Sequence, residues 1–468
     1  MSPSKRMGIA QLASLLLFGS TLAIQVDVSS TADLTDTSKR VAASIVNRYQ
    51  NSSTIPGLFD QPYYFWEGGL AWDSLVYYWA QTGDATYNEL VAEALRFQLG
   101  DNLDYMPPNQ TKSEGNDDQS YWALAAMTAA EYGFPLAPVD GQNTSWLEIA
   151  ENVFNEQAAR WDNGTCGGGL RWQIFSFNNG YRYKNSISNG NFFQLAARLA
   201  HFTGNQTYSD WASQTLQWSI KVGLAFSQDD NNSTLRAGTV FDGTDVSTGC
   251  TEINRIQWTA ALGTYLAGAA FGFNTSSTRL YASGTGFVAT VNTTFTDNDN
   301  GTISEVACAP QNNCNTDQLA FKAVLARALA QTAYFAPFSS SLADPAALAS
   351  LIQRSAKGAT LQCQVNGGSL QCGTDWVSGN NDGIEGLGQD LSVLNILLAA
   401  LPQKDIGTRQ TASNATSFGS GGNGTATGSS GGAASGTATP LPANDASGVQ
   451  ASGFALLAAL SFLVAFGL

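Results

Sequence analysis

A helix, a glycine or proline break and a second helix recur along most of this chain. Trp79–Tyr87 reads WAQTGDATY, and His201–Tyr208 reads HFTGNQTY. Looser versions of the pattern lie at Tyr132–Phe134, Phe271–Asn274 and Tyr334–Pro337. Apolar residues recur at helical spacing between these breaks, and glycine ends a helix readily because it adopts the left-handed conformation without steric cost. The pattern predicts a series of helical hairpins.

The spacing of the breaks indicates the architecture. About six hairpins of roughly 60 residues fit between Val26 and Leu401. Helical hairpins in this number predict an all-α fold, an (α/α)6 toroid whose inner helices ring a central cleft. An α-solenoid is the alternative. Gly168–Phe177 is the clearest candidate for a short strand or loop ribbon, because its apolar residues alternate.

Charge and histidine content limit the chemistry that the chain can perform. It carries 22 Lys and Arg against 37 Asp and Glu, a formal net charge of −15. Nucleic acids and anionic lipids bind basic surfaces, so we expect neither as the main partner. The single histidine, His201, matches no catalytic triad, Cys-His pair or zinc motif. Acid–base chemistry therefore falls to carboxylates, and we expect neither a metal ion nor a cofactor.

The first residues have the pattern of a secretory signal peptide. Lys5 and Arg6 precede an apolar run, Met7–Leu17, and small residues follow up to Ala23. A basic region, a short apolar core and a small-residue cleavage site are typical of a signal peptide, here residues 1–23. The apolar core is too short to span a bilayer. We expect the chain to be exported.

The last residues have the pattern of a GPI-attachment signal after a folded domain at residues 24–405. Residues 406–444 are mostly small and polar, which predicts a flexible stalk. Small residues, a short spacer and an apolar run to the chain end follow, so residues 445–468 are the expected propeptide. Asn444 is the preferred anchor residue, with Gly436 or Ser447 as alternatives. A transmembrane helix is disfavoured because the run is short and no basic residue follows it.

Six cysteines in an exported chain predict disulfides. Cys308–Cys314 and Cys363–Cys372 are close enough in sequence to pair as local loops. Cys166–Cys250 is then left as a long-range bridge, although the sequence alone leaves other pairings open. None of these spacings is that of a zinc site. Recurrent Asn-X-Ser/Thr sequons predict a glycosylated surface.

Two neighbouring aspartates, Asp117 and Asp118, are the strongest candidates for catalysis. They stand directly before the apolar run Ala123–Ala130. The simplest interpretation is a helix start, with Asn116 or Asp117 as N-cap and an acidic first turn favoured by the helix dipole. Adjacent carboxylates also repel each other, which raises the proton affinity of one and can keep it as an acid.

Aromatic residues in loops rich in glycine and asparagine favour a sugar-binding site. Sugars stack on aromatic faces and hydrogen-bond to polar side chains. The candidates are Tyr63, Tyr64, Phe65, Trp66, Tyr121, Trp122, Trp161, Trp172 and Trp376. Glycoside hydrolysis needs two carboxyl groups, one of them protonated to assist the leaving group. The aspartate pair and these aromatic residues together point to a glycosidase.

With these motifs the chain resembles glycoside hydrolase family 76, the endo-α-1,6-mannanases, and within it the fungal GPI-anchored cell-wall branch. The resemblance runs from about residue 35 to 400. It rests on FWEGG from Phe65, NDDQ from Asn116, CGGGLRW from Cys166, KNSISNG from Lys184 and FDG from Phe241. It implies an (α/α)6 fold. It also implies an endo-acting, retaining glycosidase that cleaves α-1,6-mannosidic linkages in unbranched mannan during fungal cell-wall synthesis or remodelling.

The resemblance also implies roles for single residues. Asp117 would be the nucleophile and Asp118 the general acid/base. Asp242 matches a family position near the bound mannose, although a turn before Gly243 would explain it equally well. Four further residues are candidates to line the cleft and bind substrate, with core packing or a buried ion pair as the alternative for each: Trp66, Glu67, Trp172 and Lys184.

Other functions fit parts of the same pattern. A transglycosidase joining GPI-glycan mannose to wall glucan would use the same residues, with a sugar hydroxyl in place of water. A non-catalytic mannan-binding wall protein would keep the toroid as a scaffold. A metal site like that of helical terpene cyclases needs a third carboxylate, which is missing after Gln119-Ser120. We expect a monomer, GPI-anchored to the outer leaflet of the plasma membrane or to the wall, that acts on α-1,6-mannan or GPI-glycan mannose.

Overall fold

The computed structural model describes residues 22–110, 112–139, 144–226, 237–273, 278–297, 301–335, 345–366 and 369–407. The chain divides into two compact units, residues 1–418 and 419–468, and every described residue belongs to the first. The predicted stalk beyond residue 407, the propeptide and residues 1–21 of the predicted signal peptide lie outside the described residues. Their boundaries stay predictions. None of the described helices is both long and apolar enough to cross a membrane.

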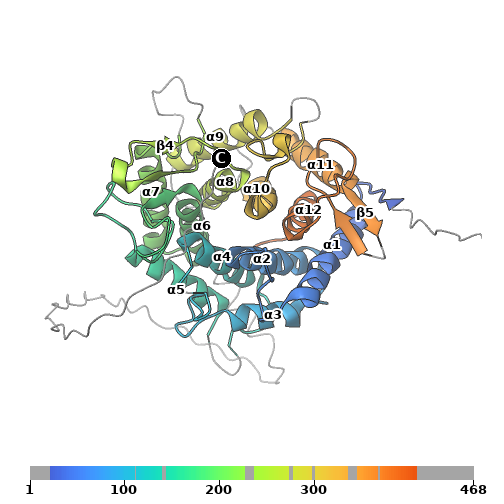
Figure 1. Ribbon diagram of the computed structural model, residues 1–468, viewed down its shortest axis with the longest axis horizontal. Helices are drawn as coiled ribbons and strands as arrows, with labels where there is room; N and C mark the ends of the chain where they lie inside the picture. The colour runs from blue at the N-terminus through green and yellow to red at the C-terminus, as the bar shows by residue number, and fades with distance from the viewer. Residues whose placement is uncertain are drawn as a thin grey trace, which may run out of the picture. The chain divides into compact units, whose positions relative to one another are not determined.

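Six inner helices form a closed ring within the described part of the chain (Figure 1). Each contacts the next, and the last contacts the first. They are α2 (Phe65–Thr82), α4 (Asn116–Tyr132), α6 (Ser186–Thr203), α8 (Thr259–Phe273), α10 (Thr316–Phe335) and α12 (Leu387–Ala400). Because the ring closes, the predicted (α/α)6 toroid is confirmed and the solenoid alternative is wrong.

An outer helix precedes each inner helix or follows it, and packs against the outside of the ring (Figure 1). These are α1 (Thr31–Ser52), α3 (Asn88–Phe97), α5 (Trp146–Ala159), α7 (Gln206–Lys221), α9 (Thr278–Thr294) and α11 (Pro345–Leu361). The outer helices α1, α3, α5 and α7 have an apolar face toward the ring and a polar face toward solvent. The inner helices are buried almost all round, as expected for helices covered on every side.

Glycines let the inner helices approach each other closely. At four glycines of the inner helices, an added Cβ atom would collide with a neighbouring inner helix: Gly69 with α4, Gly190 with α8, Gly263 with α10 and Gly388 with α10. Glycine normally weakens a helix interior because it adds backbone entropy to the unfolded chain. In this fold the close contact between helices offsets that cost.

Helix ends agree with most of the predicted glycine breaks. The residue after α2, Gly83, has φ 78°, and those after α4 and α6, Gly133 and Gly204, have φ 65° and 70°. All three therefore adopt the left-handed conformation of a helix terminator. The break expected at Gly272 comes later, because α8 continues through Phe273.

Two small antiparallel sheets complete the described structure. One joins β1 (Leu22–Ala23), β5 (Cys363–Asn366) and β6 (Ser369–Cys372), and the other joins β2 (Tyr183–Asn185), β3 (Gly243–Asp245) and β4 (Ile253–Asn254). In the second sheet Asn185 pairs with Gly243. Strand β2 runs directly into α6, so the sheet fixes where α6 begins. Gly168–Phe177 forms a loop, with one isolated bridge between Gln173 and Gly115.

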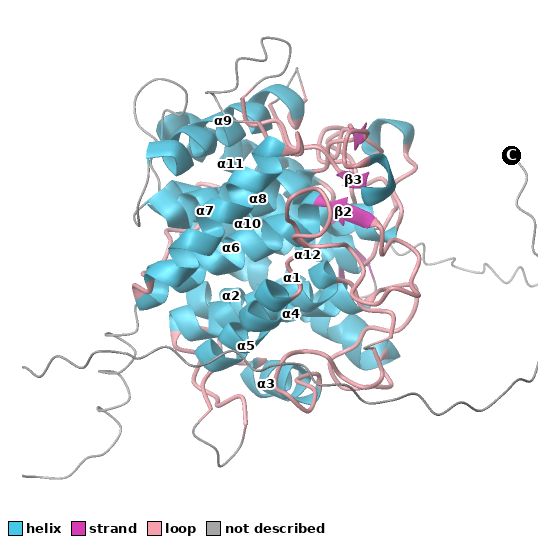
Figure 2. Cartoon of the chain, turned by 90° about the vertical axis from the view of Figure 1, so that its left-hand side faces the viewer, coloured by secondary structure: helices cyan, strands magenta, loops and turns pink. Residues whose placement is uncertain are grey.

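The short 3₁₀ helices lie in the connections, at Val246–Thr248 and Ala309–Gln311. All three predicted disulfides are present: Cys166–Cys250, Cys308–Cys314 and Cys363–Cys372. The first links the loop before β2 to the segment between β3 and β4. It therefore ties the loop that leads through β2 to α6 to the segment that leads through β4 to α8. Figure 2 shows β2 and β3 among loops gathered at one side of the helices.

Candidate active site

The starts of α2, α4, α6 and α10 meet at a cavity of about 730 Å³. Its walls carry the carboxylates Asp60, Glu114, Asp117, Asp118 and Asp317. Aromatic side chains line the rest of it: Phe59, Tyr63, Tyr64, Phe65, Trp66, Tyr121, Trp172 and Phe321. Acidic groups among aromatic faces are the composition expected of a site that binds and cleaves a sugar chain.

Asp117 and Asp118 lie in the first turn of α4 and both face the cavity. The expected N-cap at Asn116 or Asp117 is wrong, because the helix already begins at Asn116 and Gly115 is its N-cap. The side chain of Asn116 instead donates to the backbone oxygen of Arg171 at 2.9 Å. Both aspartates therefore lie in the first turn of α4, where they line the cavity.

Asp118 stabilises the helix start through its own carboxylate. Its Oδ2 accepts a hydrogen bond from the backbone N–H of Gly115 at 2.7 Å, as the acidic residue of a capping box does. A Cβ atom at Gly115 would clash with Oδ1 of Asp117. Glycine is therefore required beside the pair for space, since its φ of −92° is open to any residue.

Asp117 is held by two hydrogen bonds. Its Oδ2 accepts from the side-chain amide of Asn185 at 2.8 Å, and its Oδ1 accepts from the backbone N–H of Asp118 at 3.1 Å. Asn185 is the N-cap of α6, so the bond joins two neighbouring inner helices at their starts. Both donors favour the ionised form of the carboxylate.

The two carboxyls differ in proton affinity. Burial raises the pKa of Asp117 to about 6, against the opposing effect of the Asn185 hydrogen bond. Burial raises the pKa of Asp118 well above its usual value, and the negative charge of Asp117 raises it further. The charge of Asp317 adds to this effect. Asp117 is therefore the easier of the two to ionise, and Asp118 is the one that keeps a proton.

Trp66 and Asp317 form one wall of the cavity. Trp66 Nε1 donates to Asp317 Oδ1 at 2.7 Å. The Trp66 ring packs against Tyr121 with 4.8 Å between ring centroids and against Phe321 with 6.1 Å. Trp66 therefore presents an aromatic surface to the cavity while holding Asp317 in place.

Trp172 also lines the cavity and is 37% exposed. Its backbone N–H donates to the oxygen of Tyr183 at 2.7 Å, and its own oxygen accepts from the N–H of Asn116 at 2.8 Å. The loop that carries Trp172 is thereby bonded to both β2 and α4. Trp66 and Trp172 are the two predicted substrate-binding residues that line the cavity.

Glu67 is fully buried beneath the wall, outside the lining residues. Its Oε2 accepts from the backbone N–H of Tyr64 at 2.8 Å, which caps the start of α2. Burial raises the pKa of Glu67 to about 8, with smaller contributions from the charges of Asp317 and Asp118. Its carboxyl is therefore a neutral capping group at neutral pH.

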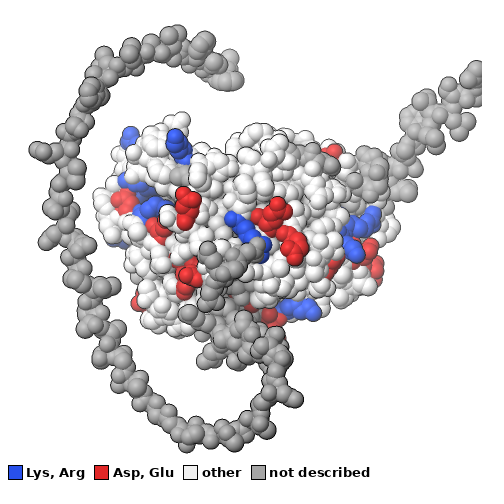
Figure 3. Space-filling view, turned by 90° about the horizontal axis from the view of Figure 1, so that it is seen from below, with Lys and Arg blue, Asp and Glu red and all other residues white. Residues whose placement is uncertain are grey.

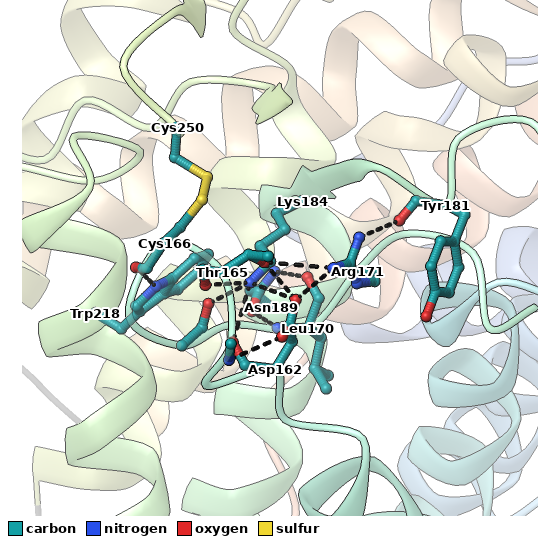
Figure 4. A network of polar contacts seen from close by, with 12 residues as sticks. Asp162, Thr165, Cys166, Leu170, Arg171, Tyr181, Lys184, Asn189, Trp218 and Cys250 are labelled. Carbon is teal, nitrogen blue, oxygen red and sulfur yellow. Dashed lines mark hydrogen bonds and ion pairs between the residues drawn. A yellow bond between two sulfur atoms is a disulfide. The ribbon is translucent and has the colours of Figure 1, made fainter. Parts of the chain in front are cut away.

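Lys184 is likewise fully buried, within the network of polar contacts in Figure 4, and is not among the residues that line the cavity. Its amine donates to the backbone oxygens of Asp162, Thr165 and Gly168, the last two at 2.9 and 2.6 Å. It also pairs with the Asp162 carboxylate at 3.2 Å. The amine therefore fastens the 162–168 loop to β2, one residue before Asn185.

Asp242 also lies outside the lining residues of the cavity. Its carboxylate accepts from Tyr183 Oη at 2.5 Å, and from Asn254 Nδ2 and Trp258 Nε1 at 2.9 Å each. Its backbone oxygen accepts from the N–H of Ser186, the first residue of α6, at 2.7 Å. These contacts link β2, β4 and the starts of α6 and α8.

Sequence reasoning assigned no role to several residues of the cavity. Asn185 was part of a quoted motif, and its place before a helical run was the available signal for an N-cap. No sequence pattern marked Asp317 as a cavity residue, because only the closure of the helical ring brings it into contact with Trp66. Glu114 lines the cavity with neither carboxyl oxygen hydrogen-bonded in the described structure, and burial raises its pKa well above the usual value.

The single histidine of the chain is not among the residues that line the cavity. His201 lies in the last turn of α6, at the opposite end of that helix from Asn185, and its ring packs edge-on against Phe271 and Phe335. No group of three or more His, Cys, Asp and Glu residues could hold a metal ion among the residues that the structure describes. On the face seen in Figure 3, acidic and basic side chains lie side by side among many uncharged ones.

Comparison with known proteins identifies the family of this chain. The profile of Glycosyl hydrolase family 76 matches residues 33–413. The mannan endo-1,6-alpha-mannosidase DCW1 of Saccharomyces cerevisiae is 39% identical, over 81% of this chain and 81% of its own length. The mannan endo-1,6-alpha-mannosidase DFG5 of Candida albicans is 34% identical, over 88% of this chain and 89% of its own.

Solved structures agree. Dfg5 from Chaetomium thermophilum, crystallised in complex with glucosamine, is 34% identical with a TM-score of 0.75, covering 83% of this chain and 95% of that one. An inactive variant of the α-1,6-mannanase GH76A of Salegentibacter sp. HEL1_6, in complex with α-1,6-mannotriose, has a TM-score of 0.62. It is 18% identical and covers 79% of this chain and 99% of that one, which shows the shared fold. The chain belongs to glycosyl hydrolase family 76.

Proposed function

We propose that the protein is an endo-acting, retaining glycosidase that cleaves α-1,6-mannosidic linkages in unbranched mannan of the fungal cell wall. The observation that carries the proposal is the aspartate pair of α4, which lies in an aromatic cavity where burial raises the pKa of both carboxyls and the charge of Asp117 raises the pKa of Asp118 further. The names of the relatives support the substrate, since DCW1 and DFG5 are called mannan endo-1,6-alpha-mannosidases.

In the first step, Asp118 gives its proton to the glycosidic oxygen while Asp117 attacks the anomeric carbon. The bond from that carbon to the leaving oxygen breaks, and the shortened chain leaves with the proton. A mannosyl ester on Asp117 remains. The high proton affinity of Asp118 suits the acid, and the hydrogen-bonded carboxylate of Asp117 suits the nucleophile.

In the second step, Asp118 is ionised and acts as a base. It takes a proton from water, whose oxygen attacks the anomeric carbon and releases Asp117. Two displacements at one carbon restore its α configuration. The cycle ends with Asp118 protonated and Asp117 ionised, as it began.

Substrate would lie in the cavity, with sugar rings stacked on the aromatic faces of Trp66 and Trp172. We assign Asp242, Glu67 and Lys184 to positioning, because each carries hydrogen bonds that hold the starts of the inner helices or the loop before β2. A transglycosidase remains an extension of the same chemistry, with a sugar hydroxyl replacing water in the second step. We place the protein outside the cell, GPI-anchored to the outer leaflet or the wall.

The test is digestion of unbranched α-1,6-mannooligosaccharides by the wild-type protein and by Asp117→Asn and Asp118→Asn. We expect internal cleavage by the wild type and loss of at least about a thousandfold in each variant. Added acceptor glycans would reveal transfer products. Sugar binding without any product, with or without acceptor, would instead identify a mannan-binding wall protein.

A further inference from the structure

The Asn185 side chain bonds to Asp117 and not to Asp118, and the Ser188 side chain is a second donor that lowers the pKa of Asp117. Asn185 Nδ2 donates to Asp117 Oδ2 at 2.8 Å. Asn185 is 8% exposed and lies at the end of β2 as the N-cap of α6, whereas both aspartates belong to α4. Nothing in the spacing of the chain indicates this contact, which joins residues 68 positions apart.

The orientation of the Asn185 amide is fixed by its other end. Its Oδ1 accepts the backbone N–H of Ser188 at 3.2 Å, which is the N-cap bond of α6. An amide flip would place Nδ2 against the Ser188 N–H, a donor facing a donor, and Oδ1 against the Asp117 carboxylate. Both contacts would then be repulsive, so the N–H of Asn185 must point at Asp117.

The backbone of Asn185 is also held in place. Its oxygen accepts from Asn189 Nδ2 at 2.9 Å, and β2 pairs Asn185 with Gly243. The amine of Lys184, the preceding residue, is caged by the 162–168 loop (Figure 4). The donor that faces Asp117 is therefore built into a rigid part of the fold and does not depend on a mobile side chain.

The charged groups nearby cannot make the same distinction. Asp118 and Tyr121 lie near Asp117 on α4, and the side chains that α6 and its N-cap bring to these residues are neutral: Asn185, Ser188 and Asn191. Asp317 on α10, Glu67 on α2 and Glu114 before α4 act on Asp118 or are acted on by it. No Lys or Arg is among the groups that shift either aspartate.

We propose that Asn185 is the positioning residue that makes Asp117, and not Asp118, the nucleophile, by aiming a fixed N–H at its carboxylate. This inference rests on the proposed retaining mechanism. An N–H donor stabilises the carboxylate and loses its value once Asp117 is protonated. Without Asn185 the two carboxyls would compete for the shared proton, and a fraction of the enzyme would carry it on Asp117.

The variant Asn185→Asp isolates the donor. Aspartate is as good an N-cap as asparagine, so the bond to the Ser188 N–H is kept. When ionised, the introduced carboxyl repels Asp117, and when protonated it can donate in place of the lost amide. We expect kcat at the wild-type optimum to fall by about tenfold or more, with KM nearly unchanged and activity recovering toward acidic pH.

Asn185→Ser gives a second variant that keeps the fold. Serine caps helices well but is too short to reach Asp117. We expect kcat to fall without recovery in acid, and the acidic limb of the pH profile to move to higher pH. The matched control is Asn205→Asp at the N-cap of the outer helix α7, where Asn205 accepts from the Thr207 N–H at 3.0 Å. Production in the bacterial periplasm allows disulfides and avoids N-linked glycans at this sequon.

A second readout does not need turnover. Aspartate carboxyl ¹³C titration by NMR, with Asp117 assigned through Asp117→Asn, should show its pKa raised in Asn185→Ser and unchanged in Asn205→Asp. If both Asn185 variants showed the pH profile and the Asp117 titration of the wild type, the inference would be overturned. The proposal that the protein is a glycosidase would still stand. A wild-type protein that makes no product would overturn the glycosidase, and the titration would still decide whether Asn185 controls Asp117.

Discussion

The indole nitrogen of Trp66 donates to Oδ1 of Asp317 at 2.7 Å, and this bond joins the start of α2 to the start of α10 at the cavity. The same carboxylate acts on the catalytic pair, because its negative charge raises the pKa of Asp118. Asp317 thus holds the Trp66 side chain in place at the cavity and also raises the pKa of the general acid, Asp118.

The variant Asp317→Asn removes that charge and keeps the shape of the side chain. The pKa of Asp118 should fall, so the basic limb of the kcat/KM profile should move to lower pH. Asp60→Asn is the control, since Asp60 lines the cavity but is not among the groups that shift Asp118. A basic limb that stays in place in Asp317→Asn would contradict the assigned electrostatic role.

The wild-type pH profile follows from the two carboxyls. The active form has Asp117 ionised and Asp118 protonated. Activity should rise as pH passes the pKa of Asp117, near 6, and fall as pH passes the higher pKa of Asp118. The two limbs belong to the coupled pair and not to either residue alone. A profile of kcat/KM against pH on one oligosaccharide measures both limbs.

Gly115→Ala should inactivate the protein without unfolding it. The added Cβ would clash with Asp117 Oδ1 and displace the carboxylate from its two donors. Misplacement of a reacting group by about 1 Å can cost roughly a hundredfold in rate. Steady-state kinetics and a thermal melt on the same sample test this.

Gly204→Ala is the contrasting control for Gly115→Ala. Gly204 has open space around it but a φ of 70°, so alanine there should cost about 1 kcal/mol of stability and leave the kinetics unchanged. Equal kinetic effects in the two variants would refute the steric explanation.

Lys184→Met should destabilise the fold more than it impairs substrate binding. The variant removes one donor from each of three backbone oxygens, of which that of Gly168 is buried, and leaves Asp162 without one of its cations, at a cost of about 3 kcal/mol. Urea unfolding measures the loss, with the exposed Lys221→Met as control. If stability were unchanged and KM alone rose, Lys184 would contact substrate after all.

Local pattern was enough to predict most of the framework. Glycines 83, 133 and 204 end helices because the left-handed conformation is a property of the residue itself. The Asp117–Asp118 pair was predicted at a helix start for the same kind of reason, since acidic residues favour a first turn. The disulfides were accessible from spacing, because the two short loops leave one remaining pair.

Contacts made by ring closure were not accessible from the sequence. Asn185 and Asp317 reach the cavity from helices far along the chain from Asp117, and no local pattern connects them. The burial of Lys184 was equally hidden, because a lysine in a motif looks the same whether its amine meets substrate or three backbone oxygens. The N-cap at Gly115 was missed because its partner is the side chain of Asp118.

The most direct test of the central claim is proton NMR of the first products released from an unbranched α-1,6-mannooligosaccharide. A retaining enzyme built on Asp117 and Asp118 should release the new reducing end first as the α anomer, with the β anomer appearing later by mutarotation. Neither anomer should form with Asp117→Asn or Asp118→Asn. Initial release of the β anomer would contradict the account, because it would require a single displacement by water and leave Asp117 without its role as nucleophile.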